Sequence, residues 1–149
     1  IAEALGCDVR IAAHPRSDYE NKPFNYSFPI LKDQTFELIK QASVVVSHGS
    51  TSLQWAVIMR KPIILVTTDE INNSTFKQTT EAFAFALGKD VVNLSRIPRK
   101  YDWKSLLFVN ETKYKNYIET YTKQSGTPEK PVWDIVIDRM ETDLFHAKD

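Results

Sequence analysis

Short runs of β-branched and other apolar residues recur along this chain, and helix-length segments separate them. The runs are centred on residues 9–13, 43–47, 63–66 and 91–94. This alternation predicts an α/β fold, in which a Rossmann-like parallel sheet is flanked by helices. In the second run three valines, at positions 44–46, are consecutive, which is typical of a strand buried on both faces.

The segments between these runs carry helix signals. Helices are expected at 35–42, with Thr35 as the N-cap, at 50–59, and at 75–87, where Gly88 ends the helix. Polar loops are expected at 17–29 and 67–74. After residue 94 we expect a helical turn at 102–109 and a polar, tyrosine-rich helix at 110–124.

The beginning of the chain indicates a longer protein. Residues 1–5, followed by Gly6, are typical of the last turn of a helix whose start is missing. The first residue is Ile1 and no leader-like segment follows it. We therefore expect residues 1–125 to form a Rossmann-like domain that is truncated on its N-terminal side.

A break at residues 126–128 separates the last segment, 126–149, from this domain. Pro131 occupies a position that proline favours, the first turn of a helix. The helix that follows carries an apolar stripe at helical spacing, formed by Trp133, Val136, Ile137, Met140 and Leu144. We expect this helix to pack on the domain or on a missing N-terminal domain.

Composition excludes several classes of function. The chain has 19 basic and 19 acidic residues, so its formal net charge is zero and a nucleic-acid-binding surface has no support. The single cysteine rules out a disulfide framework, and no apolar stretch reaches the roughly 20 residues of a membrane span. The sequence contains no metal-binding spacing, dinucleotide fingerprint, P-loop or GxSxG elbow, so we predict no metal and no cofactor.

Three of the predicted strands end in unusually polar loops. These loops read His14-Pro15-Arg16, His48-Gly49-Ser50-Thr51-Ser52 and Thr67-Thr68-Asp69-Glu70. Parallel sheets bind ligands at the carboxyl ends of their strands. We therefore expect His14, Ser50, Thr51 and Thr67 to lie on one rim of a parallel sheet.

The second loop has the composition of an anion site. A glycine allows close approach of the backbone, and three hydroxyl residues follow it in the first turn of the expected helix. The amides of a first helical turn are unpaired and attract phosphate, and hydroxyls add further donors. The alternative is that Ser50 only caps the helix.

The first loop offers a histidine and a fixed positive charge. His14 could donate a hydrogen bond to a phosphate oxygen or protonate a leaving group. Pro15 stiffens the turn, and Arg16 suits phosphate recognition. The alternative for His14, and the stronger one for His48, is a structural hydrogen bond.

The order and placement of these motifs resemble the C-terminal half of GT-B glycosyltransferases. The likeness covers about residues 9–69 and is carried by His14-Pro15 and by the segment VVVSHGSTSLQWAVIMRKPIIL, with its Ser50-Thr51-Ser52. It is greatest to bacterial enzymes of surface and capsular polysaccharide synthesis that use CMP-sugars. In that family a further strand lies in the middle of the sheet, so its absence here implies a truncated domain or a sheet that closes differently.

The resemblance implies that residues 1–125 bind a nucleotide-sugar donor, with His14 also catalytic. It implies that the catalytic base lies in the missing N-terminal domain, that this chain alone is inactive, and that the whole enzyme is cytoplasmic and acts on an acceptor glycolipid at the membrane. The residues expected to bind substrate are His14, Pro15, Arg16, His48, Gly49, Ser50, Thr51, Ser52, Thr67, Thr68 and Asp69.

Other functions stay open. The helix after the second loop carries Gln54, Trp55 and Ala56 where many relatives place a glutamate for the ribose, which favours CMP over UDP and weakens a UDP-sugar 2-epimerase-like alternative. Transfer of glycerol phosphate or ribitol phosphate from a CDP-linked donor is a further alternative. The last is a non-enzymatic α/β module that binds an anion or a partner.

Overall fold

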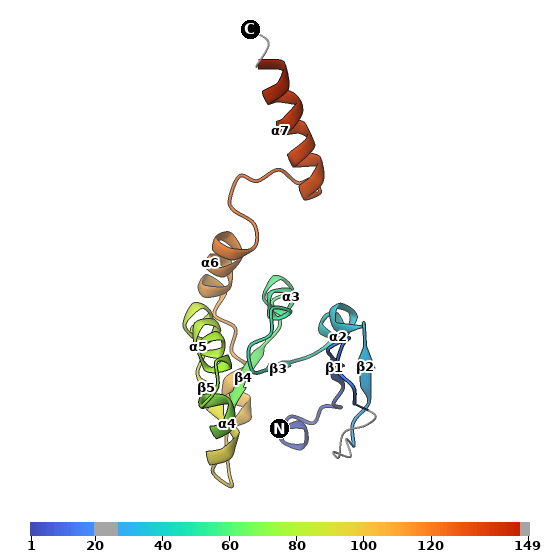
Figure 1. The fold of residues 1–149 in the computed structure, drawn as a ribbon. Coiled ribbons are helices and arrows are strands. Elements are labelled where there is room, and N and C mark those ends of the chain that lie inside the picture. Colours follow the sequence, from blue (N-terminus) through green and yellow to red (C-terminus); the bar gives the residue numbers. More distant parts are fainter. Residues whose placement is uncertain (20–26, 147–149) are drawn as a thin grey trace.

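The strands pair in parallel, but they form two small sheets and not one. The computed structural model describes residues 1–19 and 27–146 (Figure 1). One sheet pairs β1 with β2, and the other has the order β3-β4-β5. The bounds of the five strands are Ile11–Ala13, Ile30–Lys32, Val45–Ser47, Ile63–Thr67 and Val91–Asn93. The α/β class is therefore confirmed, whereas the expectation of a single sheet is wrong, because β1 takes β2 as its partner.

Strand β2 has no counterpart among the predicted strands. Its sequence holds only two apolar residues after Pro29, which is too short a pattern to predict a strand. The strand exists because Ile30 pairs with Ile11 of β1. Of the expected loop at 17–29, residues 20–26 lie outside the described part of the chain.

Strand β4 is the centre of the three-stranded sheet and is buried along its whole length. Its side chains alternate between the two faces of the sheet. On one face Ile63 and Leu65 pack among α3 (Leu53–Ile58), α5 (Phe76–Leu87) and α6 (Glu111–Tyr121). On the other face Ile64 and Val66 pack with Trp103 of the 3-10 helix η2 (Trp103–Leu107) and with Leu5 at the end of α1 (Ala2–Leu5).

Strand β3 differs from its expected environment. It lies at the edge of its sheet, and Val46 has 43% of its surface exposed. The prediction of burial on both faces is therefore wrong for this strand. An edge strand has a neighbour on one side only, and this leaves Val46 less covered than the residues of β4.

Several helix boundaries differ from the predicted ones. The N-cap of α2 (Thr35–Gln41) is Gln34, so Thr35 is the first helical residue and not the cap. Helix α3 begins at Leu53 and not at Ser50, because the carbonyls of residues 50–52 accept i to i+3 hydrogen bonds from residues 53–55 and form a tighter turn that leads into the helix. The expected polar loop after β4 contains a short helix, α4 (Asp69–Asn72), and η1 (Leu94–Arg96) follows β5. Gly6 and Gly88 end α1 and α5 as expected.

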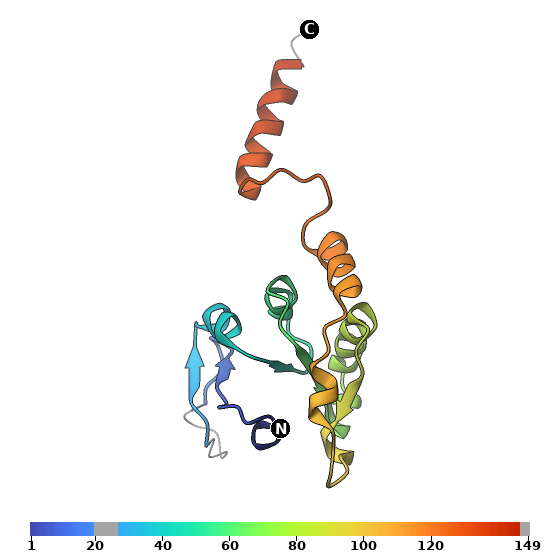
Figure 2. The same ribbon diagram turned by 180° about the vertical axis from the view of Figure 1, so that it is seen from behind.

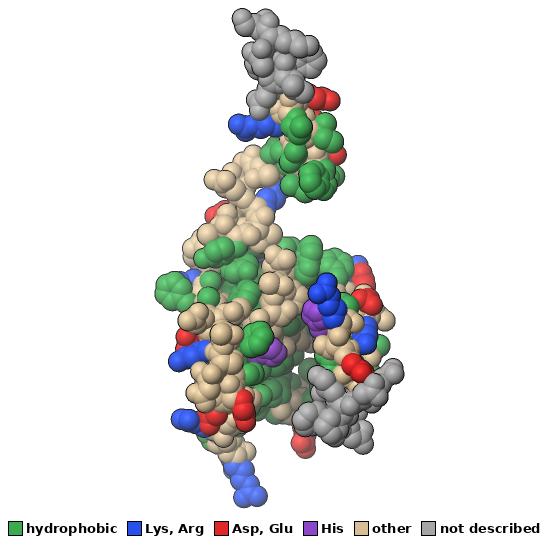
Figure 3. All heavy atoms as spheres, viewed as in Figure 1, with side chains coloured by type: hydrophobic (Ala, Val, Ile, Leu, Met, Phe, Trp, Pro, Cys, Tyr) green, Lys and Arg blue, Asp and Glu red, His purple; other side chains and the backbone are tan. Residues whose placement is uncertain are grey.

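The last helix, α7 (Val132–His146), stands away from the rest of the molecule in both ribbon views (Figures 1 and 2). Hydrophobic side chains gather along it (Figure 3), and Trp133 is 72% exposed. The domain does not cover this stripe, and packing on a missing N-terminal domain stays a prediction. The side chain of Leu144 and residues 147–149 lie outside what the structure describes. Across the described residues, none of the helices has the length and apolar character to traverse a lipid bilayer.

Candidate functional site

The three polar loops are distributed over the two sheets. The loops at His48–Ser52 and Thr67–Glu70 follow β3 and β4, which are parallel neighbours, so both begin at the same edge of one sheet. His14 follows β1 and belongs to the other sheet. The prediction of one common rim is therefore wrong for His14 and correct for the other two loops. Figure 3 shows histidine side chains on both sides of the hollow between the two halves of the molecule.

The loop after β3 is held against helix α5. The Thr80 hydroxyl, which is buried, donates a hydrogen bond to the carbonyl oxygen of His48. The His48 ring stands edge-on to Phe76 in the first turn of α5, with 6.3 Å between ring centroids. The backbone of His48 is therefore held by a structural hydrogen bond and its ring by an aromatic contact, whereas the alternative expected a hydrogen bond of the imidazole itself.

Gly49 has its own packing reason. Its φ is +106°, and a Cβ built on it would lie 3.0 Å from the Thr80 hydroxyl oxygen and 3.2 Å from the Thr80 backbone nitrogen. Only glycine allows the loop to approach the helix this closely. The sequence predicted that Gly49 lets the backbone come close to a ligand. In the structure the backbone at Gly49 comes close to α5 of the same chain.

Residues 50–52 form an exposed turn with unused hydrogen-bond donors. The Ser50 hydroxyl accepts from the Ser52 amide at 3.3 Å, and the two serine hydroxyl oxygens are 2.8 Å apart. One hydroxyl donates to the other, so one of the two protons remains available. The backbone N–H groups of Ser50 and Thr51 and the Thr51 hydroxyl have no hydrogen-bond partner within the described residues. Four donors around one turn are therefore without a partner within the described residues.

His14 is exposed and makes a tight local turn. Its Nδ1 accepts a hydrogen bond from the Arg16 amide at 3.2 Å, and its carbonyl accepts from the Ser17 amide. With Nδ1 acting as an acceptor, the proton of a neutral imidazole lies on Nε2. His14 therefore keeps an N–H donor at Nε2 on an exposed residue, next in sequence to Pro15 and the exposed Arg16.

The loop after β4 uses its polar groups internally. Thr67 is buried and its hydroxyl donates to the Asn72 side chain at 2.9 Å, while the Thr68 hydroxyl accepts from the Ile71 amide and caps α4. The Asp69 carboxylate binds Asn93 at the end of β5 and Arg96 in η1. Here helix capping and tertiary contacts account for the residues that the sequence singled out.

The pKa values of the two acidic residues in this loop follow from these contacts. The hydrogen bond from Asn93, and then the bond and charge of Arg96, lower the pKa of Asp69. A hydrogen bond from the Thr68 side chain lowers the pKa of Glu70. Both groups are therefore carboxylates at neutral pH and do not act as general acids.

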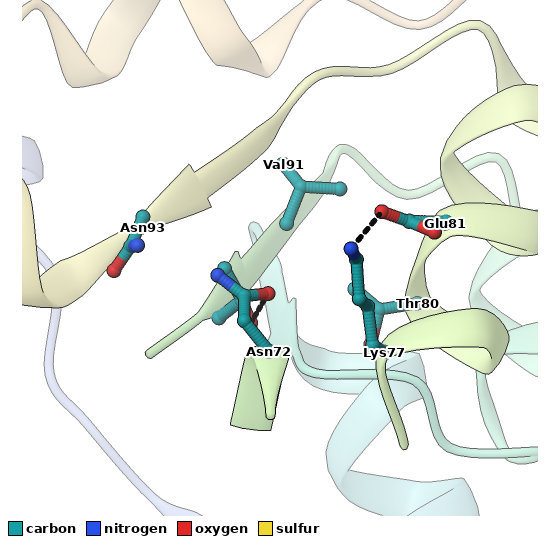
Figure 4. Close-up of a pocket in the computed structure, with 7 residues that line it drawn as sticks. Asn72, Lys77, Thr80, Glu81, Val91 and Asn93 are labelled. Carbon is teal, nitrogen blue, oxygen red and sulfur yellow. Dashed lines mark hydrogen bonds and ion pairs between the residues drawn. The ribbon is translucent and has the colours of Figure 1, made fainter. Parts of the chain in front are cut away.

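A pocket of about 340 Å³ lies where β4, β5 and the first turns of α5 meet (Figure 4). The sequence analysis identified only Thr67 among the residues that line this pocket. The others were missed because they come from three separate elements, α4, α5 and β5. The i, i+4 spacing of Lys77 and Glu81 was the signal that could have marked two of them. The lining residues are Thr67, Asn72, Lys77, Thr80, Glu81, Val91 and Asn93.

No cluster of three or more metal-ligating side chains occurs among the residues that the structure describes. Comparison of the chain with family models, with curated proteins and with solved structures found no match.

Proposed function

We propose that this chain is the donor-binding half of a nucleotide-sugar-dependent glycosyltransferase of surface polysaccharide synthesis. In this proposal the turn at residues 50–52 binds the donor phosphate. CMP-linked donors are favoured over UDP-linked ones, because Gln54, Trp55 and Ala56 stand where a ribose-binding glutamate would be expected.

The observation that carries the proposal is the set of open donors at this turn. Two backbone N–H groups and the hydroxyl protons of Thr51 and of one serine are without partners in the described part of the chain, at the carboxyl end of a parallel strand. A phosphate group has several acceptor oxygens, and hydrogen bonds to a charged acceptor are stronger than neutral ones. Gly49 and Thr80 support this arrangement by fixing the loop on α5.

In this proposal His14 and Arg16 would approach the donor from the other sheet, apart from the rim that carries residues 50–52. The Nε2–H of His14 is a donor to a phosphate oxygen. To pass a proton to the leaving nucleotide His14 would have to be an imidazolium, and it would then give up the hydrogen bond that its Nδ1 accepts from the Arg16 amide. Arg16 adds a fixed positive charge.

Nucleotide titration tests this proposal. We expect CMP to bind more tightly than UDP, and CDP to compete with it, with chemical-shift changes at residues 50–52. A Ser50→Ala, Thr51→Val double change should weaken CMP binding by about 1–3 kcal/mol, the usual cost of losing hydrogen bonds to a charged group. Binding should be reduced and not abolished, because the backbone N–H groups remain.

A matched control separates phosphate binding from folding. Ser74→Ala with Thr75→Val removes an equivalent serine and threonine hydroxyl just before α5, where the Ser74 hydroxyl donates to the Ile71 carbonyl of α4 and accepts from the Phe76 amide. CMP affinity should be unchanged in this variant. If CMP affinity is unchanged in the folded Ser50, Thr51 variant as well, the hydroxyls serve only the turn and the proposed phosphate site is wrong.

A further inference from the structure

The pocket at the ends of β4 and β5 offers a different chemistry from the turn at residues 50–52. None of residues 48–52 lines it, so the inference below does not rest on the proposed nucleotide site. Figure 4 shows Asn72 on one side of the pocket, the Lys77–Glu81 pair facing it, and Val91 between them. Its volume, about 340 Å³, is near the lower end of the range for small-molecule sites.

The hydrogen-bonding capacity of the lining residues is only partly used. Asn72 accepts from Thr67 through its Oδ1, which leaves both N–H bonds of its Nδ2 available. The Lys77 ammonium and the Glu81 carboxylate are 3.7 Å apart, and each keeps further donors or lone pairs. Asn93, by contrast, donates to Asp69 and accepts from the Ser95 amide.

The charges of the pocket exclude simple ions as ligands. The Glu81 carboxylate repels an anion that approaches Lys77. A divalent cation would find one carboxylate beside an ammonium, and no cluster of metal ligands is present in the described part of the chain. The Lys77–Glu81 pair has no net charge and offers both donors and acceptors. A neutral ligand whose groups both donate and accept hydrogen bonds therefore fits it.

We infer that this pocket binds a neutral sugar ring. A hydroxyl of the ring donates to Glu81 and accepts from Lys77, and a neighbouring hydroxyl accepts from the Asn72 amide. Val91 supplies an apolar surface for the C–H face of the ring. The volume suits a single ring and not an extended oligosaccharide.

An NMR titration with the free sugars glucose, galactose, mannose and N-acetylglucosamine tests the inference. At least one of them should give saturable shifts of the amides of residues 72, 77, 81 and 91. Lys77→Met with Glu81→Gln should weaken this binding about tenfold or more, because two hydrogen bonds to charged groups are lost. Both side chains are about half exposed, so the variant should fold, and the dispersion of its amide spectrum checks this.

The chain contains a matched control. Lys115 and Glu119 form an equivalent i, i+4 pair on α6, 4.0 Å apart, away from the pocket. Lys115→Met with Glu119→Gln should leave sugar binding unchanged.

Three results would overturn the inference. The first is the absence of saturable shifts with all four sugars. The second is binding that persists unchanged in the Lys77, Glu81 variant. The third is that inorganic phosphate or glycerol reproduces the same shifts at equal or lower concentration. The site would then bind an anion, or any small polyol, and would not select a sugar ring. CMP titration of the same variant reports on residues 50–52 separately, so either site can fail alone.

Discussion

At Gly49 two independent constraints act on one residue. The backbone φ of +106° is a conformation that residues with a side chain rarely adopt, and an added Cβ would meet the Thr80 hydroxyl at 3.0 Å. Gly49→Ala should therefore lower the free energy of unfolding by about 1–3 kcal/mol or more, the range for a strained backbone with an added clash. Urea denaturation followed by circular dichroism measures this loss.

Gly126 is the control for backbone strain without a clash. Its φ is +84°, and a Cβ placed on it would have no other atom within 4 Å among the described residues. Gly126→Ala should cost less than Gly49→Ala. Equal losses would mean that the contact with α5 contributes nothing to the choice of glycine at Gly49.

Tyr114 connects α6 to the core through a buried hydroxyl. Its Oη donates to the Lys61 carbonyl at 3.1 Å, and burial raises its pKa to about 12. In an unfolded chain the pKa of tyrosine is about 10. Because the folded pKa is the higher one, the stabilisation is complete below pH 10 and is lost as the pH rises toward 12.

Tyr114→Phe tests this pH dependence. The substitution removes one hydrogen bond, so we expect a loss of about 0.5–1.5 kcal/mol at pH 7 and a shallower decline in stability above pH 10. Denaturant titrations between pH 7 and 11.5 follow both effects. Tyr121→Phe, at a side chain that is 66% exposed, should change neither quantity. If the stability of Tyr114→Phe falls as steeply above pH 10 as that of the parent protein, the buried Tyr114 hydroxyl is not the cause of the pH dependence.

Among the secondary-structure elements, α4 depends on a contact across the sheet. This four-residue helix is too short to be stable alone, and its Asp69 carboxylate binds Asn93 at the end of β5 and Arg96 in η1. Asp69→Ala should therefore open α4 more often, so that the amides of residues 71–73, which are hydrogen-bonded in α4, exchange faster with solvent. Hydrogen exchange measured by NMR detects this change.

The pH dependence of α4 gives a second readout. The pKa of Asp69 is lowered in the folded state, so its stabilising contact is present above the unfolded pKa of about 4 and is lost as the pH falls through the folded value. Exchange of the α4 amides, corrected for intrinsic rates, should rise in acid more steeply in the parent protein than in Asp69→Ala, which keeps only the acid-sensitive contact between Glu70 and Thr68. Asp134→Ala in α7 is the control and should leave α4 unchanged.

At the scale of the whole molecule, α7 contributes little to the stability of the domain that precedes it. No hydrogen bond or ion pair in the described residues joins α7 to the chain before Lys123. Removing residues 126–149 should therefore shift Tm by no more than about 2 °C, less than the shift that a loss of 1 kcal/mol produces in a domain of this size. Calorimetry of the two proteins measures the shift.

A longer truncation gives the contrasting result. Removing residues 110–149 also deletes α6, whose Tyr114 belongs to the core among α3, α5 and β4. This protein should lose its cooperative unfolding transition. A large drop in Tm on removal of 126–149 alone would show that the apolar stripe of α7 packs on the domain in solution.

Local signals in the sequence were sufficient for most individual elements. The apolar run at 63–66 predicted a buried strand, and β4 is buried throughout because its alternate residues meet two different hydrophobic clusters. Gly6 and Gly88 predicted helix ends correctly, because a left-handed residue after a helix is a local requirement. The adjacency of the loops after β3 and β4 followed from parallel pairing alone.

The candidate site was predictable only in part. The sequence indicated the turn at residues 50–52, where four donors are without partners within the described residues, but it also assigned ligand binding to Gly49 and Asp69. The structure gives these two residues partners 31 and 24 positions along the chain, Thr80 and Asn93. A pattern of neighbouring residues contains no information about such distant partners.

Periodicity, β-branching and capping act within a few residues, so the α/β class, the buried centre of the three-stranded sheet and most helix ends could be inferred from the chain alone. The pairing of β1 with β2 in a separate sheet, which takes His14 away from the common rim, emerged only on folding. The same is true of the meeting of Asn72, Lys77 and Glu81 around one pocket. Hydrogen bonds between strands and contacts between elements depend on which distant segments pack together, and local propensity does not specify that choice.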